Sequence, residues 1–306
     1  MEIATIGIDL AKNVFQIHAV KQAGKTVLRK QLKRHQLLEF VANLKPCLIG
    51  LEACSGAHHW ARSLSKFGHI VKMMPPQFVK PYVKTNKNDM ADAEAICEAV
   101  TRPNMRFVPI KSLDQQAILS LHRVRQSSIQ NRTGLVNQIR GLLAEFGYVV
   151  PKSLHHVRKG VVSALEKAKD ELPGVFLELV TNLLDQLKSL SDFIEQIEKK
   201  IQQCCRANED CMRLTTIPGV GPLTATALVA SLADAEAFKN GRQMACWLGL
   251  VPRQHSSGGK NTLLGISKRG NTYLRTLMAN GGRSVIVANG LKCEPDPWLN
   301  NMLARP

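Results

Sequence analysis

The stretch TIGIDLAKNVFQIHAV, residues 5–20, decides the fold of the first part of the chain. Read at a period of two, Ile6, Ile8 and Leu10 face one side of a strand, while Gly7 and Asp9 face the other. This pattern predicts a strand that is buried on at least one side and ends beside a carboxylate. A bare carboxylate in that position needs an explanation, because the formal net charge of the chain is +17.

The composition favours a polyanionic partner. With 306 residues, the chain can bury one large core or two moderate ones, and its 44% hydrophobic and 21% charged residues are typical of a globular protein. Lys and Arg number 41 against 24 Asp and Glu. Such an excess indicates a nucleic-acid partner rather than a membrane, because no segment is long and apolar enough to span a bilayer.

The cysteines and the first residues indicate a cytoplasmic protein. The eight cysteines form no CxxC pair, and the group Cys204, Cys205 and Cys211 lacks histidine neighbours at ligand spacing. We therefore expect reduced thiols and no zinc site. The start of the sequence reads as a strand and not as an export signal.

Residues 1–105 and 106–208 follow different patterns. The first range alternates strand and helix patterns, with two hairpin-like strands before strand–helix units, which predicts a mixed sheet covered by helices. The second range reads as almost entirely helical. Apolar residues at spacings of four and three indicate a coiled-coil seam in this range. The seam either pairs helices within the chain or joins two chains. Its residues are Leu183, Leu187, Leu190, Ile194, Ile197 and Ile201. An earlier helix in this range carries basic residues that we expect to contact nucleic acid, namely Arg123, Arg125, Arg132 and Arg140.

Four acidic residues in the first range form a candidate metal site. Asp9 has a counterpart in Glu52 of CLIGLEACSG, and each follows a glycine by two positions. Asp89 and Asp92 stand at i,i+3 near the start of a predicted helix and share one helical face. Such a set suits Mg²⁺ or Mn²⁺, and two such ions can clamp both oxygens of a reacting phosphodiester. Each acid alone also fits a turn or a helix start.

The glycines of the two strands clear one face of the sheet. Gly7 and Gly50 precede Asp9 and Glu52, and a strand face without side chains is open to a closely approaching backbone or ligand. We expect a phosphodiester to meet the metals on the face that Gly7 clears.

Residues 209–306 form a small, mostly helical and basic part. Between Lys239 and Cys293 the sequence has Lys and Arg but no Asp or Glu, so this stretch is expected to face phosphates. The segment TTIPGVGPLTATAL has the form of a helix-hairpin-helix, in which Gly219 and Gly221 let the backbone approach a phosphate. The alternative is a plain tight turn between packed helices.

A serine doublet follows in WLGLVPRQHSSGGK. Ser256 or Ser257 would present an exposed hydroxyl to a scissile phosphate, and neighbouring cations would stabilise the charge that develops on the phosphate; these are Arg253 and Lys260. A flexible Ser/Gly loop is the alternative. The segment SKRGNTYLRTLM then opens another helix, with Lys268 and Arg269 at its amino end as further nucleic-acid contacts. Tyr273 is a rival nucleophile, although its helical spacing favours packing or a phosphate contact.

These motifs together resemble those of a known family. GIDLAK, GLEACSG and NKNDMADAEAI are similar to the acidic set of the DEDD transposases of bacterial insertion sequences. IPGVGPLTA, WLGLVPRQHSSGGK and ISKRGNTYLR are similar to the second domain of the same family, insertion-sequence family one-ten, which includes the Piv invertases. The resemblance covers nearly the whole chain in the same order.

The resemblance implies a fold, a mechanism and partners. It implies a RuvC-like, RNase H-like domain over residues 1–105, a coiled-coil region over 106–208 and a serine-bearing domain over 209–306. A bacterial transposase of this kind recombines donor and target DNA under the guidance of a bridge RNA, acts on the nucleoid, and assembles as a homo-oligomer whose subunits share a composite site. The residues carried over as magnesium ligands are Asp9, Glu52, Asp89 and Asp92. Ser257 would form a phosphoserine intermediate, because the family pattern places its serine directly before glycine.

Other functions remain open at the level of sequence. The first strand unit also resembles a phosphate loop of actin-like ATPases and sugar kinases, but no second glycine-rich phosphate loop follows. A Holliday-junction resolvase-like metal nuclease would need the four acids but not the serine. An RNA-independent DNA invertase would need no guide, and a binding protein with a degenerate metal site would need only the basic residues.

Overall fold

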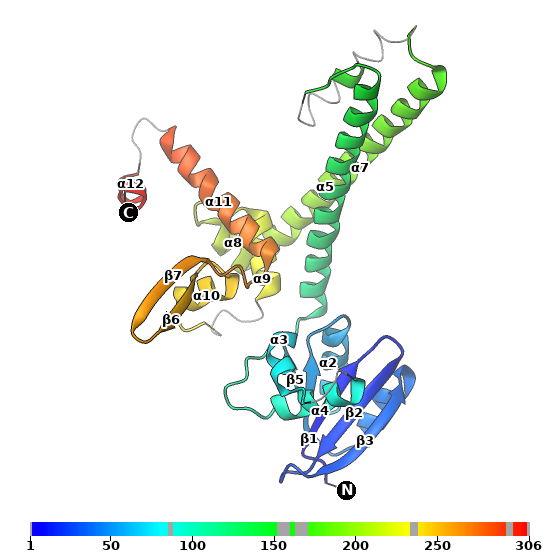
Figure 1. The fold of residues 1–306 in the computed structure, drawn as a ribbon, viewed down its shortest axis with the longest axis vertical. Helices are drawn as coiled ribbons and strands as arrows, with labels where there is room; N and C mark the ends of the chain where they lie inside the picture. Colours follow the sequence, from blue (N-terminus) through cyan, green and yellow to red (C-terminus); the bar gives the residue numbers. More distant parts are fainter. Residues whose placement is uncertain are drawn as a thin grey trace. The chain divides into compact units, whose positions relative to one another are not determined.

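The computed structural model describes residues 2–84, 88–151, 160–162, 171–232, 238–291 and 296–304. The chain forms two compact units, one built mainly from Met1–Ser112 and the other from Leu113–Ser231 and Ala235–Pro306 (Figure 1). None of the helices in the described ranges has the length and apolar composition that crossing a bilayer requires.

The first unit is built on a mixed sheet, as predicted. Its five strands lie in the order β3-β2-β1-β4-β5. The strands are β1 (Thr5–Leu10), β2 (Val14–Val20), β3 (Thr26–Lys33), β4 (Leu48–Glu52) and β5 (Ile70–Met74). β1, β2 and β3 form an antiparallel meander, whereas β4 runs parallel to β1 and β5 parallel to β4. This is the RNase H-like arrangement that the resemblance implied.

Helices cover both faces of the sheet. The main core lies on the face of Ile6 and Ile8, where α1 (Leu37–Ala42) and α2 (Ala57–Ser65) bury residues such as Phe15 and Trp60. On the other face, α4 (Asp89–Ala99) packs across β1, β2 and β4. The short elements of this unit are η1 (Arg34–Gln36), α3 (Pro76–Val79) and η2 (Lys80–Tyr82).

The glycine face of the sheet is closed by α4. A Cβ atom added to Gly7 would lie 2.2 Å from the Ala93 carbonyl oxygen and 2.4 Å from the Cys97 nitrogen. One added to Gly50 would lie 2.9 Å from the Val100 Cβ. The expectation that Gly7 clears this face for a phosphodiester is therefore wrong, because the helix backbone fills the space. A bare strand face can accommodate either a ligand or a closely approaching backbone, and here the backbone of α4 occupies it.

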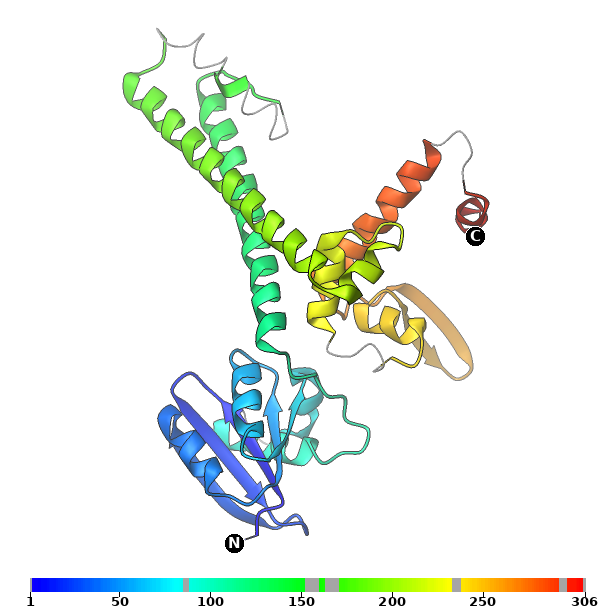
Figure 2. The ribbon, with the colours of Figure 1, turned by 180° about the vertical axis from the view of Figure 1, so that it is seen from behind.

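The second unit begins with two long helices. α5 (Leu113–Glu145) and α7 (Gly174–Arg206) run side by side in opposite directions (Figures 1 and 2). Leu187 of the predicted seam is buried in a cluster with Leu135 and Ile139 of α5, and Ile194, Ile197 and Ile201 are buried as well. An antiparallel pair within the chain therefore accounts for much of the seam.

Among its described residues, the rest of the second unit consists of helices and one β-hairpin with their connections. Its helices are α8 (Glu209–Thr215), α9 (Pro222–Ser231), α10 (Gly241–Leu248), α11 (Thr272–Gly290) and α12 (Pro297–Leu303). The hairpin consists of β6 (Pro252–Ser257) and β7 (Lys260–Ile266). α9 packs against α5, α7, α8 and α11, so it ties the long helices to the end of the chain.

Candidate metal site and serine hairpin

Three of the four predicted metal ligands meet at one end of the sheet. Asp9 stands near the end of β1, and Asp89 and Asp92 lie in the first turn of α4. The side chain of Asn88 caps this helix by accepting a hydrogen bond from the Ala91 nitrogen at 2.8 Å. One oxygen of each of the three carboxylates lies within 4.8 Å of the others. The i,i+3 spacing thus directs both helical acids toward the strand acid.

Glu52 stands at the end of the neighbouring strand. β4 is parallel to β1, and the pairing of Ile8 with Leu51 makes Asp9 and Glu52 the next residues along each strand. Period two places Glu52 on the same face as Gly50, as it places Asp9 on the face of Gly7. Glu52 is outside the group of carboxylates within 4.8 Å, but its charge contributes to the electrostatics of Asp9.

The acidic residues repel one another. The pKa of Asp9 is raised from 3.8 to about 6, mainly by burial and then by the negative charges of Asp92, Asp89 and Glu52, in that order. Within the described ranges, no Lys or Arg forms an ion pair with Asp9, Asp89 or Asp92. Such a set of carboxylate oxygens, with no Lys or Arg paired to them among the described residues, fits a hard divalent metal ion.

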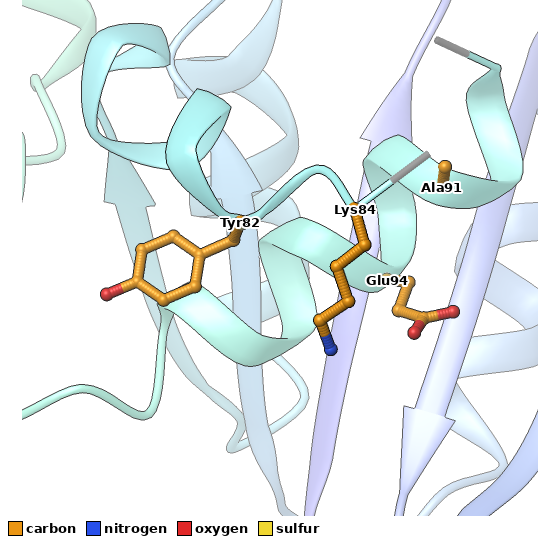
Figure 3. Close-up of a pocket in the computed structure, with 4 residues that line it drawn as sticks. All are labelled: Tyr82, Lys84, Ala91 and Glu94. Carbon is orange, nitrogen blue, oxygen red and sulfur yellow. The ribbon is translucent and has the colours of Figure 1, made fainter. Parts of the chain in front are cut away.

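On another side of α4, by contrast, the acidic residues form ion pairs with basic ones. A small pocket is lined by Tyr82, Lys84, Ala91 and Glu94 (Figure 3). Lys84 Nζ lies 2.7 Å from a Glu98 oxygen, and Arg29 donates to Glu94 at 3.0 Å. Since acids and bases compensate each other here, this pocket is not a candidate metal site.

The serine doublet lies on a β-hairpin rather than in an irregular loop. Gly258 and Gly259 connect β6 to β7 with φ values of 55° and 78°, the two positive values of a type I′ turn. Ser257 pairs with Lys260 directly beside this turn. The alternative of a flexible Ser/Gly loop does not describe this segment, because a two-residue turn lets the flanking residues pair.

The two serines face opposite sides of the hairpin. Ser256 accepts a hydrogen bond from the Gln254 side chain at 2.7 Å. Ser257, with the opposite orientation, is exposed and has no hydrogen-bond partner for its hydroxyl among the described residues. Both residues predicted to flank it as cations, Arg253 and Lys260, are exposed on the same hairpin.

The base of the hairpin is closely packed. Gly249 ends α10 at a φ of 74°, and a Cβ atom there would lie 2.8 Å from the Arg269 nitrogen. Lys268, the one described non-glycine residue with a positive φ, donates its backbone N–H to the Gly249 carbonyl at 3.0 Å. Lys268 and Arg269 lie in the turn just before α11, whose N-cap is Asn271. Arg275 of α11 donates to the Leu248 carbonyl at 3.1 Å and thereby secures this turn.

The glycines between α8 and α9 have different surroundings. Gly219 has a φ of 84°, and its added Cβ would lie 2.7 Å from the carbonyl oxygen of Gly281 in α11. α11 occupies the space beside Gly219, so helix packing explains that glycine without a phosphate. Gly221 has nothing within 4 Å of an added Cβ, and a phosphate contact stays a prediction for it.

Two of the four predicted basic residues on α5 are already engaged. Arg125 forms an ion pair with Glu198 of α7 at 2.6 Å, and Arg140 donates to the Val150 carbonyl at 3.0 Å. These contacts give Arg125 and Arg140 structural roles. Arg123 is exposed and Arg132 partly exposed, so a nucleic-acid contact stays a prediction for both.

Sequence reasoning missed a buried polar network between α5, α9 and α11. His122 is 2% exposed, and its Nδ1 lies 2.9 Å from the Tyr273 hydroxyl while its Nε2 lies 3.0 Å from the Thr226 hydroxyl. Burial lowers the pKa of His122 to about 4, so this imidazole is neutral. The contact confirms packing for Tyr273. A lone histidine in a helical segment gives no sequence signal that distinguishes such a network from an ordinary surface position.

Two family models match the chain. One, described as a transposase of the IS116/IS110/IS902 family, matches residues 211–294, and the other, a DEDD transposase model of the IS110 type, matches residues 6–147. The first range includes the serine hairpin and the second includes all four acids.

Individual relatives are similar over nearly the whole chain. A probable family 20 transposase of Pseudomonas aeruginosa is 48% identical over 309 residues, which cover 100% of this chain and 91% of that protein. The transposase for insertion sequence element IS1328 of Yersinia enterocolitica is 42% identical, with 99% and 90% covered. The pilin gene-inverting protein of Moraxella bovis is 24% identical, with 83% and 73% covered.

Proposed function

Since the chain belongs to the IS116/IS110/IS902 family of transposases, we propose that it cuts and rejoins DNA with a divalent metal held by Asp9, Glu52, Asp89 and Asp92 and with Ser257 as the nucleophile. The observation that carries this proposal is the meeting of Asp9, Asp89 and Asp92 within 4.8 Å. Residues 80 positions apart in sequence converge there without a compensating base among the described residues.

The acidic residues fit Mg²⁺ or Mn²⁺. When bound, such an ion acts as a Lewis acid on phosphoryl oxygens and lowers the pKa of bound water. The chain itself contributes a rigid arrangement, since Asp9 is fixed by the sheet and Asp89 and Asp92 by the capped first turn of α4. The raised pKa of Asp9 means that this carboxyl is only half ionised near pH 6, and a bound cation would favour its ionised form.

Ser257 would act by covalent catalysis. Its hydroxyl loses a proton as its oxygen bonds to phosphorus, and one ribose oxygen of the cut strand leaves and takes up a proton. Attack by the hydroxyl of a second strand then reverses these steps and rejoins the DNA. The exposed position beside a tight turn and the pairing with Lys260 support this role, whereas the Ser256 hydroxyl is bonded to Gln254.

Partners beyond DNA are part of the same proposal. The net charge of +17 suits binding of both donor and target DNA and of a guide RNA. We also propose a homo-oligomer in which the acidic residues and the serine of different subunits form one composite site. The exposed or partly exposed basic residues Arg123, Arg132, Arg253, Lys268 and Arg269 are candidates for phosphate contacts.

A covalent adduct tests the mechanism. The full-length protein is mixed with Mg²⁺, the terminal RNA of its element, and labelled donor and target DNA, and then separated on a denaturing gel. We expect an adduct with the wild type and with Ser256→Ala, and none with Ser257→Ala or Asp9→Asn. Cleavage without an adduct that Ser257→Ala leaves intact would instead favour a metal nuclease of the resolvase type. An adduct that forms equally without RNA would favour an RNA-independent invertase.

A further inference from the structure

A cluster of basic residues lies at the same end of the sheet as the acidic residues. Between Asp9 and Glu39 the sequence contains Lys and Arg but no Asp or Glu. Lys12 is exposed in the turn between β1 and β2, and Lys33 is exposed at the end of β3. Neither lysine is among the nucleic-acid contacts that the sequence predicts.

The strand register places Lys33 on the face of the sheet that carries Asp9. Asp9 pairs with Gln16 across β1 and β2, and Gln16 pairs with Gln31 across β2 and β3. Lys33 follows Gln31 by two residues, so period two returns it to the same face. It also pairs with Val14, the first residue of β2 after the turn that holds Lys12.

This register also gives the distance from the acidic residues. Two strand spacings separate Asp9 from Gln31, about 10 Å, and two further residues along β3 add about 7 Å in the perpendicular direction. The Cα atom of Lys33 thus lies roughly 12 Å from that of Asp9. At 3.4 Å of helix rise per nucleotide, this corresponds to roughly three nucleotides of a DNA strand.

Arg34 holds the two lysines in place. Its backbone N–H donates to the Asn13 carbonyl at 2.9 Å, and its Nη1 donates to the Lys12 carbonyl at 3.2 Å. Its guanidinium stacks 5.1 Å from the ring centroid of Trp60, which is buried. The end of β3 is therefore tied to the β1–β2 turn, and both are supported by the core.

The amino groups of these lysines are available to a ligand. Within the described ranges, neither Lys12 nor Lys33 forms an ion pair, in contrast to Arg29 on the same strand, which pairs with Glu94 at 3.0 Å. β3 is an edge strand with exposed residues at most of its positions, so a nucleic-acid strand can run along it without displacing protein.

We infer that Lys12 and Lys33 form a phosphate subsite that holds the DNA strand being cut, on the β3 side of the acidic residues. The inference rests on the proposed function, since it assigns these lysines to the strand whose phosphodiester reacts at Asp9. They are positioning residues: they bind the phosphates that flank the reacting one, within roughly three nucleotides.

The same hairpin provides a matched control. Lys21 and Lys25 are exposed at the opposite end of β2 and β3, where the Lys21 N–H donates to the Lys25 carbonyl at 3.0 Å. Lys12→Ala/Lys33→Ala and Lys21→Ala/Lys25→Ala each remove two positive charges from the meander of β1, β2 and β3. Only the first pair lies near Asp9.

The first measurement is the salt dependence of DNA binding. All proteins carry Asp9→Asn so that the donor DNA duplex stays uncut. Each lost phosphate contact lowers the slope of log K against log salt by about 0.9. We expect Lys12→Ala/Lys33→Ala to lower the slope by nearly 2 and to weaken binding at least tenfold at 0.1 M salt, relative to Lys21→Ala/Lys25→Ala. Equal slopes for the two pairs would overturn the inference.

The second measurement locates the contact. Single phosphates near the cleavage site are replaced by neutral methylphosphonates, one per duplex, with and without the element's terminal RNA. A replacement within about three nucleotides of the cleavage site should weaken binding with Lys33 present and have no effect with Lys33→Ala. Coupling only to distant phosphates, or a Lys33 effect that appears only when RNA is added, would overturn the inference. Wild-type cleavage that Asp9→Asn abolishes is recorded in parallel, so failure of the subsite is distinguished from failure of the proposed function.

Discussion

Replacing Asp9 by asparagine should stabilise the metal-free protein. The pKa of Asp9 is raised from 3.8 to about 6, which is about 2 units. At about 1.36 kcal/mol per unit this amounts to about 3 kcal/mol, and solvent screening of a half-buried carboxyl reduces it to roughly 1–2 kcal/mol. Asparagine avoids this cost because it carries no charge, and its side-chain oxygen can still accept the hydrogen bond that the Leu10 N–H donates to Asp9.

The pH dependence follows from the direction of the shift. The folded protein binds the Asp9 proton more tightly than the unfolded chain, so the free energy of unfolding falls as the pH rises from about 4 to about 6. Above pH 6 the cost is fully present, and below pH 4 it is absent. The Asp9→Asn variant should therefore be more stable than the wild type at pH 7.5 and equally stable at pH 3.5.

Urea unfolding with one tryptophan reports on the first unit alone. Trp60 lies in the core of that unit, so Trp247→Phe/Trp298→Phe leaves its fluorescence as the only tryptophan signal. In EDTA at pH 7.5, we expect the urea midpoint of Asp9→Asn to lie above that of the wild type, with the same dependence of the unfolding free energy on urea. Added Mg²⁺ should raise the midpoint of the wild type more than that of the variant. Glu39→Gln, an exposed acid in α1, is the control and should show neither effect. A lower midpoint for Asp9→Asn in EDTA would refute the reasoning from repulsion.

Three further predictions concern other parts of the molecule. Gly7→Ala should destabilise the first unit by about 2 kcal/mol or more and abolish cleavage, because its Cβ would lie 2.2 Å from a carbonyl oxygen of α4. Gly134→Ala is the control and should be tolerated, because an added Cβ there meets open space. Equal urea midpoints for the two variants would argue against close packing at Gly7. Tyr273→Phe should lower the free energy of unfolding by about 1 kcal/mol, because the hydrogen bond to His122 is lost, and it should retain the covalent adduct. Loss of the adduct in a folded variant would identify Tyr273 as the nucleophile. Gly258→Val should reduce adduct formation although Ser257 is intact, because a β-branched residue disfavours the φ of 55°; an unchanged adduct yield would show that the turn does not position the serine.

Much of the first unit could be predicted from its sequence. Alternation in residues 5–20 indicated a hairpin with one buried face, and the acids at strand ends and at i,i+3 indicated where they would meet. Local periodicity carries this information because strand and helix periods fix which residues share a face. The role of Gly7 could not be predicted, since a bare strand face suits a ligand and a helix equally, and only the path of α4 decides between them.

The second unit was harder to predict because its contacts join distant segments. The sequence did not indicate a hairpin for the Ser/Gly segment, yet two glycines with positive φ close one, and its base is secured by Arg275, 18 residues after Ser257. The sequence predicts nucleic-acid contacts for Arg125 and Arg140, although their guanidinium groups are bonded to Glu198 and to the Val150 carbonyl. Helical spacing cannot distinguish an arginine that binds phosphate from one that joins two helices.

The most direct test of the account is to locate the metal. Crystals of the full-length protein are grown with Mn²⁺, and anomalous diffraction is recorded at the manganese edge. We predict an anomalous peak bonded to oxygens of Asp9, Asp89 and Asp92, which is lost in crystals of Asp92→Asn. A manganese-bound crystal with no peak at these carboxylates, or with its peak at other residues, would contradict the claim that they form the catalytic metal site.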